Sequence, residues 1–173
     1  MKYSVITLSE KDISAVIRML LQLYAKEREA NPLLPNQIMG SGSEAELPIK
    51  RAISNGAVGL LSEGQIIGFL GISALFKFKG QQAALLGELC HGTLQNNRLE
   101  AYQLLYKALG EHLQRQRTQL HIIAHFAHDR LLQESVFQLG FGAFLAERIR
   151  DLTAIDGAAD IEIFQENDFA TIQ

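Results

Sequence analysis

AVGLLSEGQIIGFLGISALF, residues 57–76, is the stretch that carries the strongest signal for the fold. Two long apolar runs flank the pair Glu63-Gly64, a combination typical of a tight turn between antiparallel strands. A further turn at residues 78–80 leads to QAALLGELCH, residues 82–91, which predicts a third antiparallel strand. We therefore expect an antiparallel sheet in the middle of the chain.

The residues before this hairpin predict one strand and two helices. Ser9 and Asp12 have the spacing of a capping box, and apolar residues recur at helical intervals after them. Two prolines and two glycines then interrupt the helical pattern and indicate a long loop. The expected strand, first helix, loop and short second helix are residues 3–8, 13–24, 31–43 and 44–54.

The residues after the hairpin alternate between helix and strand patterns, and Gly140 closes the last helix. We expect helices at 97–116 and 129–139, strands at 119–126 and 143–152, and a weaker strand at 160–164. This order predicts an α/β (α+β) fold in which a mixed, mostly antiparallel central sheet of six to seven strands carries helices on both faces.

Composition narrows the class of protein. The chain has 173 residues, of which 47% are hydrophobic and 20% charged, as expected for one globular domain. Its net charge of −3 and scattered basic residues predict neither nucleic acid nor a membrane surface as a partner. A single cysteine, Cys90, and the absence of signal-peptide features at the N-terminus predict a cytoplasmic location.

Three segments, in this order and spacing, resemble the GNAT acetyltransferase superfamily. They are VITLSEKDISAVIRML (residues 5–20), LLSEGQIIGFLGI (residues 60–72) and DRLLQESVFQLGF (residues 129–141). The resemblance implies one acyltransferase domain over residues 1–164 and a tail at 165–173. It also implies that acetyl-CoA lies between two splayed strands and gives its acetyl group to an amine, on a small molecule or a peptide, by direct attack in a ternary complex. The loop 31–43 is where we expect this acceptor to enter.

The resemblance also implies a set of cofactor-binding residues. The backbone at the end of the third central strand would hold the pantetheine arm, and the next loop would hold the pyrophosphate. Only Ala101 fits the family's glycine-rich pattern well, because Leu99 replaces a glycine and Glu100 adds a negative charge. Arg98 compensates as a phosphate ligand, or else it lies in solvent on an ordinary polar loop. The implied cofactor residues are Leu89, Cys90, His91, Asn96, Asn97, Arg98, Leu99, Glu100, Ala101 and Asp129.

Catalysis of amine acetylation needs a base, because an ammonium has no lone pair with which to attack a thioester. Glu88 is the candidate base, since it lies in an otherwise apolar strand; the alternative is that it faces solvent. Val136 stands where the family often has a tyrosine that protonates the leaving thiolate, and valine cannot donate a proton. Asp129 stands where an asparagine is frequent, and we favour a helix cap for it.

Two further patterns leave alternatives open. One is a cluster of three histidines, His121, His125 and His128. Strand residues four apart are separated by ~13 Å, so no metal site is predicted. His125 or His128 can still act as an acid or base. Residues 164–169 echo residues 8–13, so the tail at 165–173 either begins a truncated second repeat or matches by chance.

The resemblance also leaves a second class of function open. It is a non-catalytic GNAT-fold module for CoA sensing or protein interaction, including pairing as a homodimer. Leu99 and Val136 favour this alternative, because both depart from residues that the family uses to bind or process acetyl-CoA.

Overall fold

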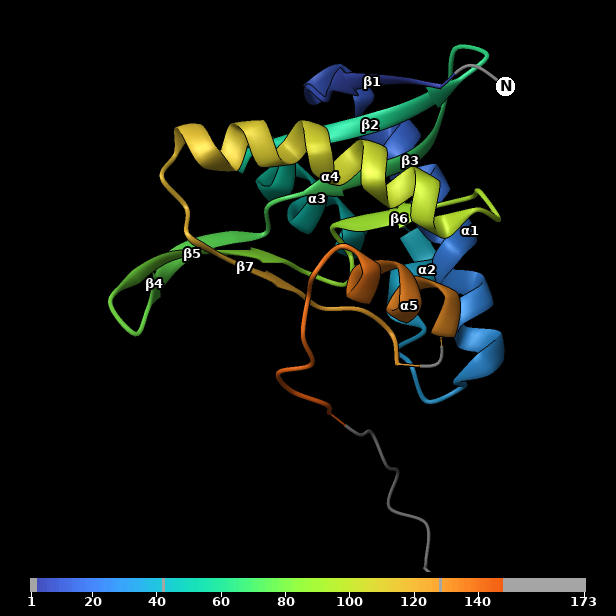
Figure 1. The fold of residues 1–173 in the computed structure, drawn as a ribbon. Helices are drawn as coiled ribbons and strands as arrows, with labels where there is room; N and C mark the ends of the chain where they lie inside the picture. The colour runs from blue at the N-terminus through green and yellow to red at the C-terminus, as the bar shows by residue number, and fades with distance from the viewer. Residues whose placement is uncertain (1–2, 42, 128, 148–173) are drawn as a thin grey trace, which may run out of the picture.

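The computed structural model describes residues 3–41, 43–127 and 129–147, and the structural statements below concern these residues (Figure 1). The strands are β1 Ser4–Thr7, β2 Ala57–Ser62, β3 Gln65–Gly71, β4 Ala74–Phe78, β5 Gln81–Leu86, β6 His91–Thr93 and β7 Leu120–Ile123. The helices are the 3-10 turn η1 Glu10–Asp12 and α1 Ile13–Ala30, α2 Gln37–Ser41, α3 Ser43–Asn55, α4 Arg98–Arg115 and α5 Arg130–Gln138.

The predicted hairpin is formed by β2 and β3. Its two strands pair antiparallel, and Ser62 opposes Gln65 across the turn. Glu63 and Gly64 both adopt positive φ, at 51° and 80°. Two consecutive residues with positive φ match the right-handed twist of the strands, and glycine takes this conformation at no steric cost. The turn therefore fixes the register of the two central strands.

The strands form two sheets, so the expectation of a single sheet of six to seven strands is wrong in this respect. The first sheet has the order β1-β2-β3-β6, and the second has the order β4-β5-β7. The mixed α/β class is confirmed, because every pairing is antiparallel except the parallel pairing of β5 with β7.

The division arises within the predicted strand 82–91. Residues Gly87–Cys90 form a turn, in which the N–H of Cys90 donates to the carbonyl of Gly87 at 2.8 Å. The side chain of Ser73 supports this turn, because its hydroxyl donates to the carbonyl of Leu85 at 2.8 Å and accepts the N–H of Gly87 at 3.2 Å. The predicted strand therefore becomes β5 in one sheet and β6 in the other.

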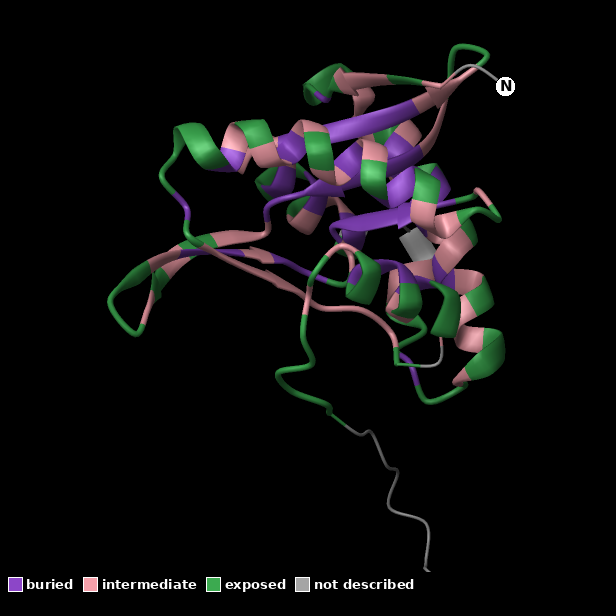
Figure 2. Cartoon of the chain, in the orientation of Figure 1, coloured by how far each residue is buried: buried purple, intermediate pink, exposed green. Residues whose placement is uncertain are grey.

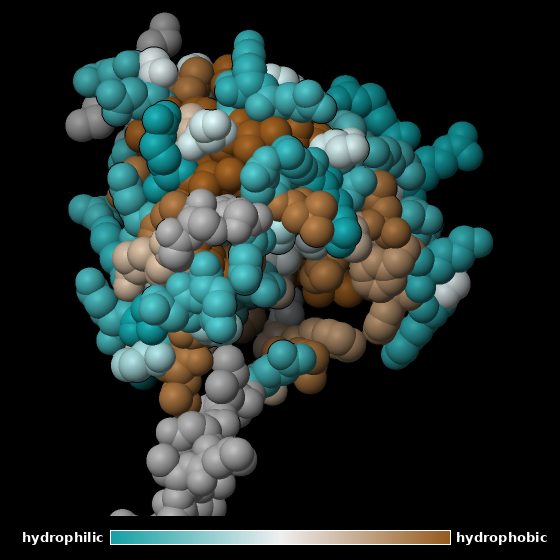
Figure 3. Space-filling view, turned by 180° about the vertical axis from the view of Figure 1, so that it is seen from behind, coloured by the Kyte–Doolittle hydropathy of each residue, from teal (hydrophilic) through white to brown (hydrophobic). Residues whose placement is uncertain are grey.

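Helices cover both faces of the first sheet, as predicted (Figure 1). Helix α4 packs on one face with α5 beside it, and α1 and α3 pack on the other face. Each face has its own apolar core, and Figure 2 shows the buried residues concentrated in β2, β3, β6 and the inner sides of the helices. From behind, hydrophilic side chains cover most of the surface, with apolar patches between them (Figure 3).

The C-terminal expectations are met only in part. Helix α5 is present, whereas residues 143–147 of the predicted strand 143–152 are not in a strand, and Phe144 and Leu145 are exposed. The remainder of that strand, the weaker strand at 160–164, the domain boundary at 164 and the tail at 165–173 lie outside the described residues. Within the described residues, the longest helices are too polar to cross a membrane.

Candidate active site

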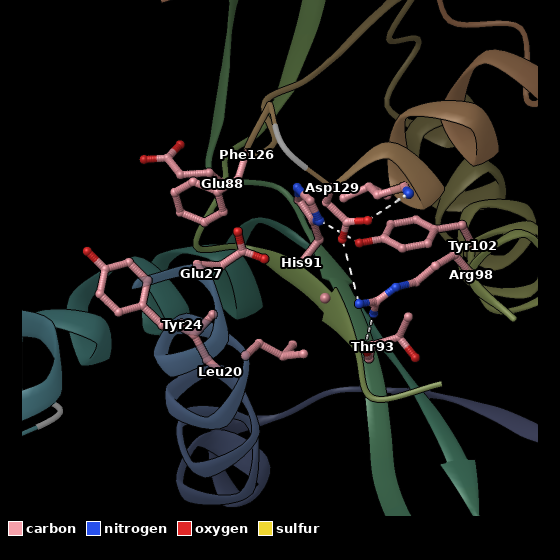
Figure 4. A pocket seen from close by; sticks show the side chains of 13 residues that line it. Leu20, Tyr24, Glu27, Glu88, His91, Thr93, Arg98, Tyr102, Phe126 and Asp129 are labelled. Atoms are coloured by element: carbon pink, nitrogen blue, oxygen red, sulfur yellow. Dashed lines mark hydrogen bonds and ion pairs between the residues drawn. The ribbon is translucent and has the colours of Figure 1, made fainter. Parts of the chain in front are cut away.

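A small cavity lies where the two sheets separate, beside the turn Gly87–Cys90 (Figure 4). Side chains from α1, this turn, β6, α4, the segment after β7 and α5 line it. Its volume is about 40 Å³, and one water molecule needs roughly 10–15 Å³. The cavity can therefore hold about three water-sized groups, and it brings together polar side chains that are distant in the sequence.

His91 bridges the separation between the sheets. Its Nε2 lies 2.7 Å from the carbonyl oxygen of Ala124, just beyond β7, and its Nδ1 lies 2.6 Å from the hydroxyl of Tyr102 on α4. A carbonyl only accepts, so we assign the proton to Nε2, and Nδ1 accepts the O–H of Tyr102. Burial lowers the pKa of His91 from 6.5 to about 4. The imidazole is therefore neutral near pH 7.

The backbone of β6 directs hydrogen-bonding groups into the separation. Toward β3, Leu94 donates its N–H and Cys90 accepts with its C=O, both at 2.8 Å. Alternate residues of an antiparallel strand bond to the same neighbour, so the N–H and C=O of His91 and Thr93 point to the opposite side. His91 therefore directs its N–H and C=O toward the separation, and Thr93 directs its N–H there, whereas the C=O of Thr93 accepts from Arg98.

The other two residues predicted to hold pantetheine are differently placed. Leu89 is half-buried and packs against the core beneath α1. Cys90 uses its N–H within the turn and its C=O toward β3, and burial raises the pKa of its thiol to about 12. Of Cys90 and His91, it is therefore His91 that turns backbone groups toward the separation.

Arg98 lies in the cavity and not in solvent. Its guanidinium donates to the carbonyl of Thr93, and Nη2 lies 3.6 Å from Oδ2 of Asp129. The two charged side chains are only 22% and 16% exposed. Asp129 also caps α5, because its Oδ1 accepts the N–H of Leu132 at 3.0 Å. Both Asp129 and Arg98 thus join elements on either side of the cavity.

Three backbone N–H groups at the start of α4 already have partners. The side chain of Asn97 accepts the N–H of Glu100 at 3.3 Å and donates to the carboxylate of Glu100 at 3.2 Å. The N–H groups of Arg98 and Ala101 donate to the carbonyls of Asn96 and Asn97. A phosphate bound here would have to displace Asn97 and approach the negative charge of Glu100. This part of the predicted cofactor site does not fit a pyrophosphate as it stands.

Two departures from the family pattern lie away from the cavity. Leu99 is half-buried and is not among the residues that line the cavity. Val136 is 3% exposed and belongs to the core between α4, α5 and the sheet. Neither side chain lines the cavity at the separation between the sheets.

Glu88 lies at the mouth of the cavity. It is on the turn and not inside a strand, so the expectation of an apolar strand environment is wrong, and its side chain is exposed, as in the solvent-facing alternative. Figure 4 shows its carboxylate turned toward the outside of the cavity. The geometry is compatible with proton transfer through a water molecule.

The clustered histidines do not form a shared site in the described part of the chain. His121 accepts or donates at the hydroxyl of Tyr106, 2.6 Å away, and His125 contacts the carbonyl of Phe126 at 3.1 Å. His128 lies outside the described residues. Among the residues that the structure describes, no group of three histidine, cysteine or acidic side chains could hold a metal ion.

Sequence reasoning missed most of the residues that line the cavity, and four of them matter for its chemistry. Tyr24 and Glu27 on α1, Tyr102 on α4 and Phe126 after β7 all line it. The two tyrosines fall on the apolar stripes of their helices, so their sequence pattern indicates only a core position. No local signal identifies Glu27 or Phe126, because only the tertiary fold brings them to the cavity.

Comparison with known proteins supports the same architecture. No protein-family model and no curated protein sequence matches the chain, whereas many solved structures do. Ribosomal-protein-alanine N-acetyltransferase from Brucella melitensis biovar Abortus 2308 is 15% identical, with a TM-score of 0.62 over 87% of this chain and 100% of its own. A predicted acetyltransferase from Clostridium acetobutylicum, solved with acetyl-CoA, is 15% identical, with a TM-score of 0.62 over 87% and 97%.

A third solved structure is the aminoglycoside acetyltransferase meta-AAC0020 from an uncultured soil metagenomic sample, in complex with sisomicin. It is 13% identical, with a TM-score of 0.61 over 87% of this chain and 97% of its own. These likenesses extend over most of every chain compared. The protein therefore has the fold of the GNAT acetyltransferase superfamily.

Proposed function

We propose that the protein is an acetyl-CoA-dependent N-acetyltransferase that acts on an amine by direct attack in a ternary complex. The observation that carries this proposal is the polar cavity at the separation of the two sheets, lined by Glu88, His91, Arg98 and Asp129. The resemblance to the GNAT superfamily implies that the thioester of acetyl-CoA binds at this separation. The acetyltransferase neighbours support this class of reaction without identifying the acceptor.

Different parts of the site fit acetyl-CoA to different degrees. The N–H and C=O groups of His91 and the N–H of Thr93 would hold the pantetheine arm, and Arg98, once released from Asp129, would pair with a phosphate. The self-capped start of α4 makes the pyrophosphate contact weaker than a glycine-rich loop would. Acetyl-CoA supplies an activated acyl group when it is bound.

The protein's own contribution is to orient the acceptor and to remove its proton. Glu88 would receive the ammonium proton through a water molecule at the mouth of the cavity, because its carboxylate is exposed. His91 is neutral and holds the hydroxyl of Tyr102, so it keeps the walls of the site in place without adding a charge.

The test is acetyl transfer to a panel of amines, followed by the thiol that the reaction releases. Glu88→Gln should lower kcat by about 10²-fold and leave the KM for acetyl-CoA unchanged, since a general base acts in the transition state. Glu63→Gln, an exposed glutamate on the β2–β3 turn, is the matched control and should keep full activity. Equal kcat values in the two variants would remove Glu88 from the mechanism.

A second candidate function rests on the self-capped first turn of α4 and on Val136. Asn97 occupies the N–H that a phosphate would use, and the buried Val136 supplies no acid. Both observations favour a GNAT-fold module that senses CoA or binds another subunit without catalysis. Such a protein would bind acetyl-CoA, or a partner, and release no thiol with any amine of the panel.

A further inference from the structure

The cavity has two chemically different ends (Figure 4). At one end Arg98 is paired with Asp129 beside Tyr102. At the other end the rings of Tyr24 and Phe126 meet edge to face, with centroids 6.1 Å apart. The first end is an ion pair, and the second combines aromatic walls with acidic side chains.

Glu27 supplies the negative charge of the aromatic end. It lies one turn after Tyr24 on α1, and Figure 4 shows its carboxylate directed toward the middle of the cavity. Its charge helps to raise the pKa of Tyr102 across the cavity, after the larger effect of burial. The second acidic side chain, Glu88, stands at the mouth on the same side. Among the described residues that line the cavity, Arg98 is the only arginine or lysine, and Asp129 neutralises its positive charge.

A carboxylate beside two aromatic rings is a site for an organic cation. The carboxylate accepts charge-assisted hydrogen bonds from an ammonium, and the ring faces attract the same cation through their quadrupoles. The cavity volume of about 40 Å³ is about three times the roughly 10–15 Å³ that one water molecule needs, which suits one ammonium and one or two methylene groups. A branched or quaternary ammonium would be too large.

We propose that Glu27, Tyr24 and Phe126 bind the ammonium of the acceptor, and that the acceptor is a primary amine on an unbranched alkyl chain. This inference rests on the proposed function, because it identifies the cavity as the place of transfer. The hydroxyl of Tyr24 donates to the carbonyl of Pro35 at 3.0 Å, so the loop 31–36 is tied to this end of the site. The rest of the acceptor would leave the cavity past Glu88, which would receive the ammonium proton through a water molecule.

The experiment is a calorimetric titration of the full chain with 1,4-diaminobutane, first without CoA and then with CoA at saturation. The uncharged isostere 1,4-butanediol and a quaternary analogue, N,N,N-trimethylbutylammonium, are the ligand controls. Diaminobutane should bind saturably with one site, and both controls should fail to bind. Binding is the readout, so a protein that fails to transfer acetyl groups still tests the inference.

Variants locate the binding energy. Glu27→Gln should weaken diaminobutane binding by about tenfold, the loss expected for a hydrogen bond to a charged group. Phe126→Leu should weaken it by about two- to fivefold, as expected for an exposed cation–π contact. Glu111→Gln changes an exposed glutamate on α4 and is the matched control, with unchanged binding expected. Unfolding curves of each variant show whether the fold is intact.

The outcomes separate this inference from the proposed function. Diaminobutane binding that Glu27→Gln does not weaken would overturn the inference, and so would no diaminobutane binding with or without CoA. Neither result touches acetyl-CoA binding, which tests the proposed function separately. Binding of the quaternary analogue as tightly as diaminobutane would likewise contradict the proposed size limit.

Discussion

Protonation of His91 should make the protein unstable in mild acid. The imidazole is 5% exposed, with both ring nitrogens in hydrogen bonds, and burial lowers its pKa from 6.5 to about 4. The unfolded chain therefore binds a proton below pH 6.5, whereas the folded chain binds it only near pH 4. The stability that neutral His91 contributes is complete above pH 6.5 and is lost as the pH falls toward 4.

The magnitude follows from the same shift. The interval from 6.5 to about 4 corresponds to about 3 kcal/mol at ~1.4 kcal/mol per pKa unit. Between pH 7 and pH 5 the expected loss of unfolding free energy is about 2 kcal/mol, because the titration of the unfolded chain is then nearly complete. Other titrating groups add their own pH dependence, so a variant without the imidazole is needed.

The assay compares urea unfolding of the wild type and His91→Gln by circular dichroism at several values between pH 7 and pH 5. The wild type should lose about 2 kcal/mol more than the variant over this range. A nuclear magnetic resonance titration of the wild-type His91 ring gives an independent measurement, with no protonation expected above pH 5. Parallel stability curves, together with a ring that titrates near pH 6.5, would refute this account of the bridge.

Three further predictions concern packing, the cap and the thiol. Gly71→Ala should cost about 1–3 kcal/mol of unfolding free energy, because the added methyl would lie 2.9 Å from Cβ of Ala52. Gly110→Ala meets nothing within 4 Å and should stabilise α4 by up to ~1 kcal/mol. Equal urea midpoints for the two variants would contradict this prediction. Asp129→Ala should destabilise the protein by about 1 kcal/mol through loss of the α5 cap. Asp129→Ser keeps a capping oxygen and should recover most of this lost stability. If it does not, the loss comes from the ion pair between Asp129 and Arg98 and not from the cap. Iodoacetamide should alkylate Cys90 rapidly in urea and very slowly in the native protein at pH 8, because burial raises the pKa of the thiol to about 12. Similar alkylation rates in both states would contradict this and show that the turn Gly87–Cys90 opens.

The order of most elements could be predicted from local patterns. The Glu63-Gly64 turn between two apolar runs has one favourable geometry, and the structure contains it. The division of the sheet could not be predicted in this way, because the apolar run through Gly87 contains a turn that is held by Ser73 in the link between β3 and β4. The same run predicts a strand position for Glu88, which lies on the turn instead.

The side chains of the candidate site are harder to predict than the fold. Arg98 and Asp129 were each identified singly, but their pairing joins two helix starts and depends on the tertiary structure. Tyr102 fits the apolar stripe of α4, and only the position of His91 gives its hydroxyl a partner. Sequence spacing carries little information about such contacts between distant elements.

Binding of acetyl-CoA tests the central claim most directly. A calorimetric titration should show one saturable site in the wild type, about tenfold weaker binding by Arg98→Ala, and unchanged binding by Arg115→Ala at the exposed end of α4. The absence of any binding at millimolar acetyl-CoA would contradict the claim that the separation between the two sheets receives a thioester.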